Sequence, residues 1–206
     1  MKKLNRKASA VAASLTMGAA ALLGAAPVAQ AADGAELQDA VESVADGTWT
    51  EADLDLIRQN PELAAMVPDP EADAEVEISD STEDDGGIST RAAKGTKTVN
   101  VSVRNRSLLG STIYEYKNTV TFSYSGGKVT KWGSRSYSFP YKQGVVDLQK
   151  RTVNTASATG KTTAKSTMEH QVKLCAPIYG CYANNYPKIE ITAKGTGGYT
   201  SKTKPR

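Results

Sequence analysis

Period-two alternation of apolar and polar residues runs through residues 91–206 of this chain of 206 residues. Valine occupies every second position of 99–103, and in 112–125 Tyr, Val and Phe share one side while Glu, Lys and Thr share the other. Alternation over such lengths predicts strands with one buried face. We therefore expect 96–206 to be an all-β domain, an antiparallel β-sandwich or open barrel of six to seven strands.

Further runs of this kind are candidates for strands, namely 128–139, 145–148, 161–175, 188–194 and 199–202. Gly133 interrupts the first of them and predicts a β-bulge. Pro140 predicts the end of the same strand, because proline cannot donate a backbone hydrogen bond. The small polar residues of 154–160 predict a loop.

The charge of the chain changes sign at 86–91. Residues 32–90 contain 18 acids and one basic residue, Arg58, for a net charge of −17. Residues 91–206 contain 20 basic residues and four acids, for a net charge of +16. We infer an acidic arm joined to a basic domain, and a basic domain of this kind attracts polyanions or acidic protein surfaces.

The first 31 residues have the three parts of a secretory signal peptide. A basic start (1–7) is followed by an Ala-rich apolar run (8–23) and by the small-residue sequence Ala29-Gln30-Ala31. This order predicts export and cleavage after Ala31. The apolar run is too short to span the roughly 30 Å hydrocarbon core of a bilayer, and we expect no later membrane span. The predicted location is extracellular.

Cys175 and Cys181 are the two cysteines of the chain. In an oxidising compartment such a pair is expected to form a disulfide, which would clamp the loop 175–181. A structural zinc ion takes four ligands, and His170 is the only histidine that could join the two sulfurs. We expect neither a metal site nor a cofactor.

The acidic arm, 32–67, is expected to contain two or three short helices. Apolar residues recur at helical spacing as two stripes, Leu37, Val41 and Val44 and then Leu54 and Ile57. Gly47 predicts the end of the first helix, and 50–53 is a loose capping box at the start of the second. Asn60-Pro61 is expected to break that helix and start one further turn. Residues 68–95 are rich in Pro, Asp, Glu, Ser and Gly, which predicts a disordered acidic linker.

Three functions are open for the arm. It solvates the basic domain, or it binds a partner protein through its two apolar stripes, or it is a pro-segment that masks the basic domain until it is cut at Arg91 or Lys94. Two are open for the clamped loop. Pro177, Ile178 and Tyr179 either bind a partner from a rigid turn or fold back to cap the core.

The pattern does not assemble a catalytic site. A nucleophilic serine or cysteine needs a base, yet His170 lies on the inward side of its strand and Glu169 on the outward side. Glu115, Glu169 and Glu190 fall on strand faces that carry Lys, Gln and Thr, which is typical of a solvated face with cross-strand charge pairs. We predict no catalytic residue and no enzymatic activity.

Three blocks resemble a family of small secreted actinobacterial proteins, namely RSLLGSTIY (106–114), SYSGGKVT (123–130) and YGCY (179–182). Members have an export signal, a variable N-terminal arm and a β-rich C-terminal domain. The likeness covers about 97–200 and leaves the arm uncovered. The family is similar to the adaptor subunit of secreted umbrella toxin particles.

That resemblance implies a non-enzymatic linker between a lectin-bearing subunit and a repeat-containing toxin subunit. It also implies that an extended N-terminal segment of the adaptor binds a protease-like domain of the lectin subunit. None of the three blocks is a catalytic motif, so the resemblance implies no active-site residue.

The function expected from the sequence is that of a secreted adaptor whose β-domain and arm contact different protein partners. One alternative is a basic domain that its pro-segment masks and that binds cell-wall or nucleic-acid polyanions after cleavage. Nucleic acid is disfavoured because two of its three aromatic candidates, Tyr114 and Trp132, are expected in the core. The other alternative is a hydrolase whose site, such as a triad with Asp147, the pattern does not reveal.

Overall fold

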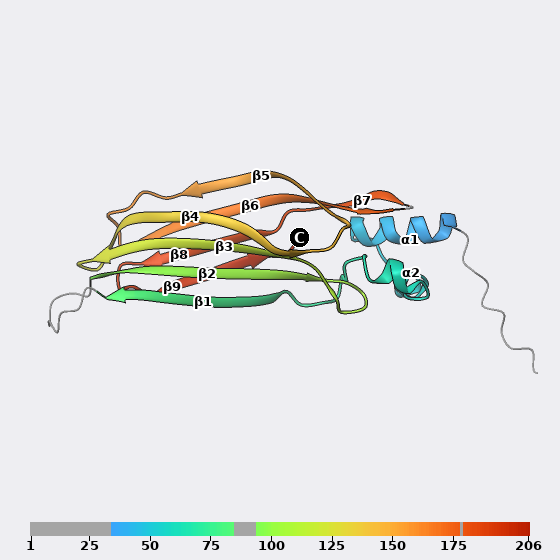
Figure 1. Cartoon of the computed structure of the whole chain (residues 1–206), viewed down its shortest axis with the longest axis horizontal. Coiled ribbons are helices and arrows are strands. Elements are labelled where there is room, and N and C mark those ends of the chain that lie inside the picture. The colour runs from blue at the N-terminus through green and yellow to red at the C-terminus, as the bar shows by residue number, and fades with distance from the viewer. Residues whose placement is uncertain (1–33, 85–93, 178) are drawn as a thin grey trace, which may run out of the picture. The chain divides into compact units, whose positions relative to one another are not determined.

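Three helices and nine strands follow one another in the part of the chain that the computed structural model describes, residues 34–84, 94–177 and 179–206 (Figure 1). The helices are α1 (Gly34–Asp46), α2 (Glu51–Arg58) and α3 (Pro61–Ala64). The strands are β1 (Glu75–Asp84), β2 (Gly95–Arg106), β3 (Thr112–Ser125), β4 (Lys128–Lys142), β5 (Val146–Ala156), β6 (Thr163–Ala176), β7 (Gly180–Asn185), β8 (Lys188–Lys194) and β9 (Tyr199–Lys204). None of the described helices has the length and apolar character needed to cross a membrane.

The strands form two antiparallel sheets. One has the order β1-β2-β3-β4, and the other has the order β5-β6-β8-β9 with β7 also paired to β6. Across the interface β4 packs over β6, β3 over β8 and β2 over β9. The predicted all-β sandwich is confirmed, and β1 with β9 and β4 with β5 form its two open sides.

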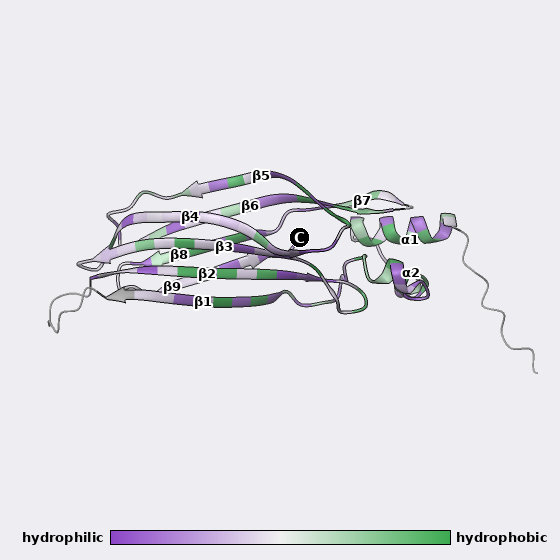
Figure 2. Ribbon diagram, in the orientation of Figure 1, coloured by the Kyte–Doolittle hydropathy of each residue, from purple (hydrophilic) through white to green (hydrophobic). Residues whose placement is uncertain are grey.

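The core is built from the faces that the alternation predicted. The inward residues of β2 and β3 are fully buried or nearly so, namely Val99, Val101, Val103, Tyr114, Tyr116, Val120, Phe122 and Tyr124. They share one cluster with Met168 of β6 and Ile189 of β8. Hydrophobic and hydrophilic bands alternate along β2 in Figure 2. Removing this apolar surface from water is the main term that stabilises the sandwich.

The bulge predicted at Gly133 is confirmed. In the β3–β4 register Val120 lies opposite Arg135 and Phe122 opposite Trp132, so two residues of β4 stand against Thr121 alone. A Cβ atom on Gly133 would lie 3.0 Å from Cγ2 of Thr121, which leaves little room for any other residue there.

Several strand boundaries differ from the prediction. β4 does not end at Pro140 but continues to Lys142, because β4 is the last strand of its sheet and an edge strand tolerates a missing N–H. β5 is longer than expected and takes in the first part of the predicted loop, up to Ala156. β7 was not predicted, since its sequence GCYANN carries no regular alternation of apolar residues.

The prediction of a disordered linker over 68–95 is wrong for residues 75–84, which form β1. This strand pairs with β2 over its whole length, from Glu75 opposite Arg104 to Asp84 opposite Gly95. Residues 85–93 lie outside the described residues.

The acids of β1 carry like charges that repel one another, and cations of β2 neutralise them. The guanidinium of Arg104 lies 2.5 Å from a carboxylate oxygen of Glu75 and 2.9 Å from one of Glu77. Arg106 binds the second oxygen of Glu75. Opposite charges on neighbouring strands favour pairing, so the arm and the basic domain complement each other residue by residue along this pair of strands.

The helices of the arm are confirmed with their predicted caps. In α2 the amide of Thr50 donates to the Asp53 carboxylate (2.7 Å), and the amide of Asp53 donates to the Thr50 hydroxyl (3.3 Å). Gly47, with φ of +75°, follows α1 in the left-handed conformation that ends many helices. The side chain of Asn60 caps the single turn of α3.

The helices bury their apolar stripes against one another and against the β6–β7 hairpin of the same chain. The residues of this helical cluster are Leu37, Ala40, Val41, Val44, Leu54, Ile57, Leu63, Ala64, Val67 and Ala176. Leu37 is the most exposed of them, at 8%. The prediction that Leu37, Val41, Val44, Leu54 and Ile57 bind a partner protein is therefore wrong for the folded chain, because the neighbouring helices and the hairpin already bury them.

Candidate functional site

The clamped loop is the turn of the β6–β7 hairpin. Cys175 and Cys181 are register partners and form the predicted disulfide, with their Cα atoms 3.8 Å apart. Tyr179 packs against the helical cluster. Of the two interpretations of this loop, Tyr179 therefore follows the capping one. Pro177 is exposed and stays a candidate for partner binding.

Three predicted site residues belong to parts of the chain that the structure does not describe. Ile178 of the loop and the two predicted processing sites, Ala31 and Arg91, all lie outside the described residues.

His170 is a buried polar residue, as predicted. Its Nδ1 lies 2.9 Å from the carbonyl oxygen of Gln171, and its ring lies 5.0 Å from that of Tyr137 and 5.1 Å from that of Phe139. Burial lowers the pKa of His170 below its ordinary value of 6.5, and the positive charge of Arg151, its register partner on β5, lowers it further. The imidazole is therefore uncharged at neutral pH.

The three glutamates of the basic domain are paired with cations, as their strand faces indicated. Glu115 lies 3.0 Å from Arg104, Glu190 lies 2.9 Å from Lys165, and Glu169 lies 3.6 Å from Lys188. Asp147 accepts a hydrogen bond from Gln149. Among the described residues, no three His, Cys, Asp or Glu side chains are grouped so that they could hold a metal ion.

A surface that we did not predict lies on the side of the sandwich bounded by β4 and β5. We call it the β4–β5 edge. It is defined by the inward residues of the two strands, namely Trp132, Arg135, Tyr137 and Phe139 of β4 and Leu148 and Arg151 of β5. Register places them there, since Tyr137 lies opposite the buried Asn118 of β3 and Arg151 lies opposite the buried His170 of β6.

Apolar side chains of this edge are exposed although they face the interior of the sandwich. Tyr137 is 37% exposed and Leu148 is 36% exposed. Tyr137 packs edge-on against Phe139, whose ring in turn lies 5.1 Å from that of the buried Tyr116. A group of exposed apolar side chains that is continuous with the core indicates an interaction site more than single exposed residues do.

Two arginines lie within this apolar group. Arg135 donates from Nε to the hydroxyl of Ser166 (2.9 Å) and from Nη2 to the carbonyl of Thr155 (2.7 Å). The guanidinium of Arg151 lies over the ring of Tyr137, 5.7 Å from its centroid. Burial lowers the pKa of Arg135, and the like charge of Arg151 lowers it further.

The segment that bears this edge has an unbalanced charge. Residues 128–156 contain six Lys and Arg and one acid, Asp147, for a net charge of +5. Neither Arg135 nor Arg151 pairs with a carboxylate in the described part of the chain. The arrangement can bind an anion next to aromatic rings.

Sequence reasoning missed this edge although part of its signal was visible. Of the aromatic residues of β4, only Trp132 was expected in the core, and alternation indicates only which side a residue faces. It does not indicate whether a residue at the rim of the sandwich is covered.

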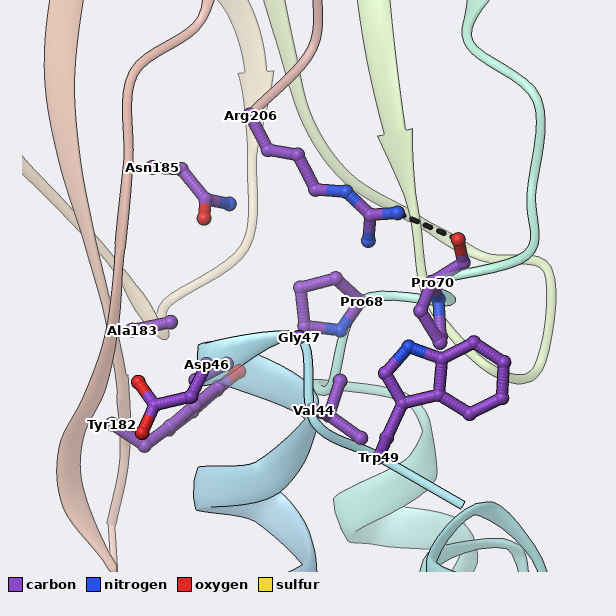
Figure 3. A pocket seen from close by; sticks show the side chains of 11 residues that line it. Val44, Asp46, Gly47, Trp49, Pro68, Pro70, Tyr182, Ala183, Asn185 and Arg206 are labelled. Carbon is purple, nitrogen blue, oxygen red and sulfur yellow. Dashed lines mark hydrogen bonds between the residues drawn. The ribbon is translucent and has the colours of Figure 1, made fainter. Parts of the chain in front are cut away.

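A cavity of about 230 Å³ lies where the helical cluster meets the sandwich, lined by residues that include Val44, Asp46, Trp49, Pro68, Tyr182, Asn185 and Arg206 (Figure 3). The guanidinium of Arg206 donates to the carbonyls of Asp69 (3.2 Å) and Pro70 (2.7 Å). Most small-molecule sites are larger, at about 300–1,000 Å³. We assign the cavity to the joint between arm and sandwich.

Comparisons with known proteins find no match for this chain, neither to a family model nor to a curated protein nor to a solved structure.

Proposed function

We propose that this chain is a secreted, non-enzymatic adaptor that binds a protein partner through the β4–β5 edge. The observation that carries the proposal is the exposure of Tyr137 and Leu148 beside Arg135 and Arg151, which lack a carboxylate partner in the described residues. Tyr and Arg are prominent among the residues that carry most of the binding free energy in protein interfaces.

The outer surface of the helices supports the role of an adaptor, because it differs in chemistry from the β4–β5 edge. Residues 34–64 contain eight acids and one basic residue, Arg58, for a net charge of −7. Their apolar stripes are buried, so the acids point outward. Two surfaces of opposite charge favour two different partners. The resemblance to umbrella-particle adaptors agrees with this proposal and suggests a lectin-bearing subunit and a repeat-containing toxin subunit as the partners.

The described part of the arm is folded onto the hairpin rather than extended. We therefore assign partner binding to the β4–β5 edge and not to the apolar stripes of the arm. The net charge of +5 over residues 128–156 also favours a second candidate function, binding of a cell-wall polyanion. The two differ in what is recovered, a protein or a polymer, and polyanion binding weakens steeply as salt rises.

The test is affinity purification from culture supernatant with the immobilised full chain, followed by mass spectrometry. An edge variant, Tyr137→Ser/Arg151→Gln, is compared with a matched control variant, Tyr186→Ser/Lys202→Gln, which also loses one exposed tyrosine and one exposed cation. We expect a protein that the wild type and the control retain and that the edge variant loses by about tenfold or more. Equal recovery on all three proteins contradicts the proposal, and recovery of a carbohydrate or teichoic polymer that disappears at high salt supports the second candidate.

A further inference from the structure

The side of the sandwich opposite to the β4–β5 edge is occupied by an acid of this chain. There Lys97 of β2 lies over the ring of Tyr199 of β9, with Nζ 5.7 Å from the ring centroid. The carboxylate of Asp80 lies 2.9 Å from Nζ of Lys97 and accepts a hydrogen bond of 3.3 Å from the Tyr199 hydroxyl. β1 thus carries a carboxylate to a cation and a tyrosine that come from different sheets.

β1 places apolar side chains on the same face as this acid. Val76, Ile78 and Asp80 each lie opposite one of the inward valines of β2, so all three face the interior of the sandwich. The face that β1 presents has the pattern apolar-x-apolar-x-acid. Val76 and Ile78 remain 40% and 46% exposed, so backbone pairing and the ion pairs hold this strand more than burial does.

The β4–β5 edge has the same kind of cation–tyrosine pair. Arg151 of β5 lies over the ring of Tyr137 of β4, and this pair also joins the two sheets. The two pairs differ in how far a neighbouring strand shields them from solvent. Lys97 keeps 17% of its side chain exposed under β1, whereas Tyr137 is 37% exposed and Arg151 is exposed.

β4 also has a free edge on which a strand could form. Within the described residues β4 pairs only with β3, apart from the single bridge between Val129 and Lys161 at its start. Pro140 lacks the N–H that a new neighbour would need, so a ladder would run along 130–139. That length is sufficient for an ordinary strand of five to six residues.

We infer that the β4–β5 edge binds an extended acidic strand of a partner protein, with the pattern apolar-x-apolar-x-acid, that pairs with β4 as β1 pairs with β2. The inference rests on the proposed function and names the chemical class of the partner. The carboxylate lies between Arg135 and Arg151 and removes the repulsion between them. The apolar residues of the strand cover Tyr137, Phe139 and Leu148. Addition of a strand to a free sheet edge is a common mode of peptide recognition.

A second copy of this chain does not meet this description, because the acids that β1 would offer are already bound to Lys97, Arg104 and Arg106 of their own chain. Charge complementarity therefore favours a separate protein whose acidic strand has no cations of its own.

The probe for this inference is a synthetic peptide with the sequence of β1, EVEISDSTED. It is titrated into the isotope-labelled full chain, and backbone amide shifts are followed by NMR. We expect shifts along β4 and β5. The Asp80→Asn form of the peptide should bind about tenfold more weakly, because it lacks the carboxylate for the two arginines.

Two protein variants complete the test. Arg151→Gln should weaken peptide binding about tenfold, whereas the neighbouring Lys150→Gln, which removes the same charge from the same strand, should change it by less than about threefold.

Shifts confined to β2 and β9, equal binding of the two peptides, or no binding would each overturn the inference. Concentration-dependent dimers of the full chain that Arg151→Gln abolishes would overturn it in favour of a second copy. If partner capture depends on Tyr137 and Arg151 while the peptide fails, the proposed function stands and only the strand mode is lost.

Discussion

The hydroxyl of Tyr182 donates a 2.7 Å hydrogen bond to the carbonyl of Met66, 116 residues earlier in the chain. Tyr182 directly follows the disulfide residue Cys181, and Met66 lies just after α3. Burial raises the pKa of Tyr182 well above its ordinary value, so the hydroxyl remains a donor throughout the ordinary pH range. Packing and this bond hold the acidic helices on the clamped hairpin, and the opposite net charges of the two parts are not the only attraction between them.

Replacing Tyr182 by phenylalanine should destabilise the chain by about 1 kcal/mol, because the Met66 carbonyl loses its donor in a partly buried place. Urea unfolding measures this change. Tyr186→Phe is the matched control, since the Tyr186 side chain is 36% exposed, and its effect should stay within about 0.5 kcal/mol. Equal effects of the two substitutions would show that the Tyr182 bond contributes nothing specific.

Removing the disulfide should destabilise the chain by about 2 kcal/mol, the loop-entropy value for a ring of this size. The Cys175→Ala/Cys181→Ala variant tests this. Because Ala176 and Tyr179 of the clamped hairpin pack on the helices, amide exchange should accelerate in α1 and α2 more than in β2 and β3. Uniform acceleration over the whole chain would contradict a local role for the disulfide.

The β8–β9 turn and the β3–β4 turn touch at two glycines. A Cβ atom on Gly195 would lie 2.0 Å from the carbonyl oxygen of Gly127, a distance that no side chain can occupy. We expect Gly195→Ala to cost about 3 kcal/mol, since backbone must move. Gly144→Ala is the control, because a Cβ atom there meets nothing within 4 Å. A melting temperature for Gly195→Ala as high as that of the control would disprove the close approach.

Local rules predicted the parts of this fold that depend on local chemistry. The alternation around Val99 and Tyr116, the capping box at Thr50, the bulge at Gly133 and the disulfide all follow from residue type and spacing, and all are confirmed. The predictions that the structure contradicts concern features that depend on contacts between residues far apart in the sequence. β1 looked disordered because the cations that neutralise it, Arg104 among them, lie on another strand.

The candidate site was missed for the same reason. Whether Tyr137 is covered depends on what lies beyond the last strand of the sheet. The spacing of residues in the sequence does not indicate whether another element covers that edge. The stripes of the arm were predicted to bind a partner protein, yet they pack on one another and on the β6–β7 hairpin of the same chain. Amphipathic spacing predicts burial without naming the surface that provides it.

Cutting the chain after Arg91 should leave the two pieces associated. β1 stays paired with β2 over its ten residues, and the helical cluster stays packed on the hairpin. Cleavage at this site with a specific protease, followed by gel filtration and mass spectrometry, should give one species that contains both pieces, and denaturant should separate them. A basic piece that elutes alone without denaturant would support the alternative that the arm is a pro-segment released by cleavage.

The stability of the chain should fall as pH drops from about 7.5 to about 5.5, because His170 is held uncharged in the fold. Burial lowers its pKa in the folded chain, with Arg151 adding to the effect, so the unfolded chain takes up the proton first as pH falls through the ordinary value of 6.5. The stability that the uncharged His170 contributes is fully present above the ordinary pKa of 6.5 and is lost as the pH falls below it.

The carboxylates titrate in a separate range. Hydrogen bonds from Arg106 and Arg104 lower the pKa of Glu75 from its ordinary 4.5, and Lys97 lowers that of Asp80 from 3.8. The stability that these carboxylates contribute is therefore lost only under more acidic conditions. Urea unfolding at several pH values measures the slope. His170→Phe, which keeps an aromatic ring against Tyr137 and Phe139, should flatten the slope between about pH 7.5 and 5.5. If the slope is unchanged in that variant, a group other than His170 causes the pH dependence.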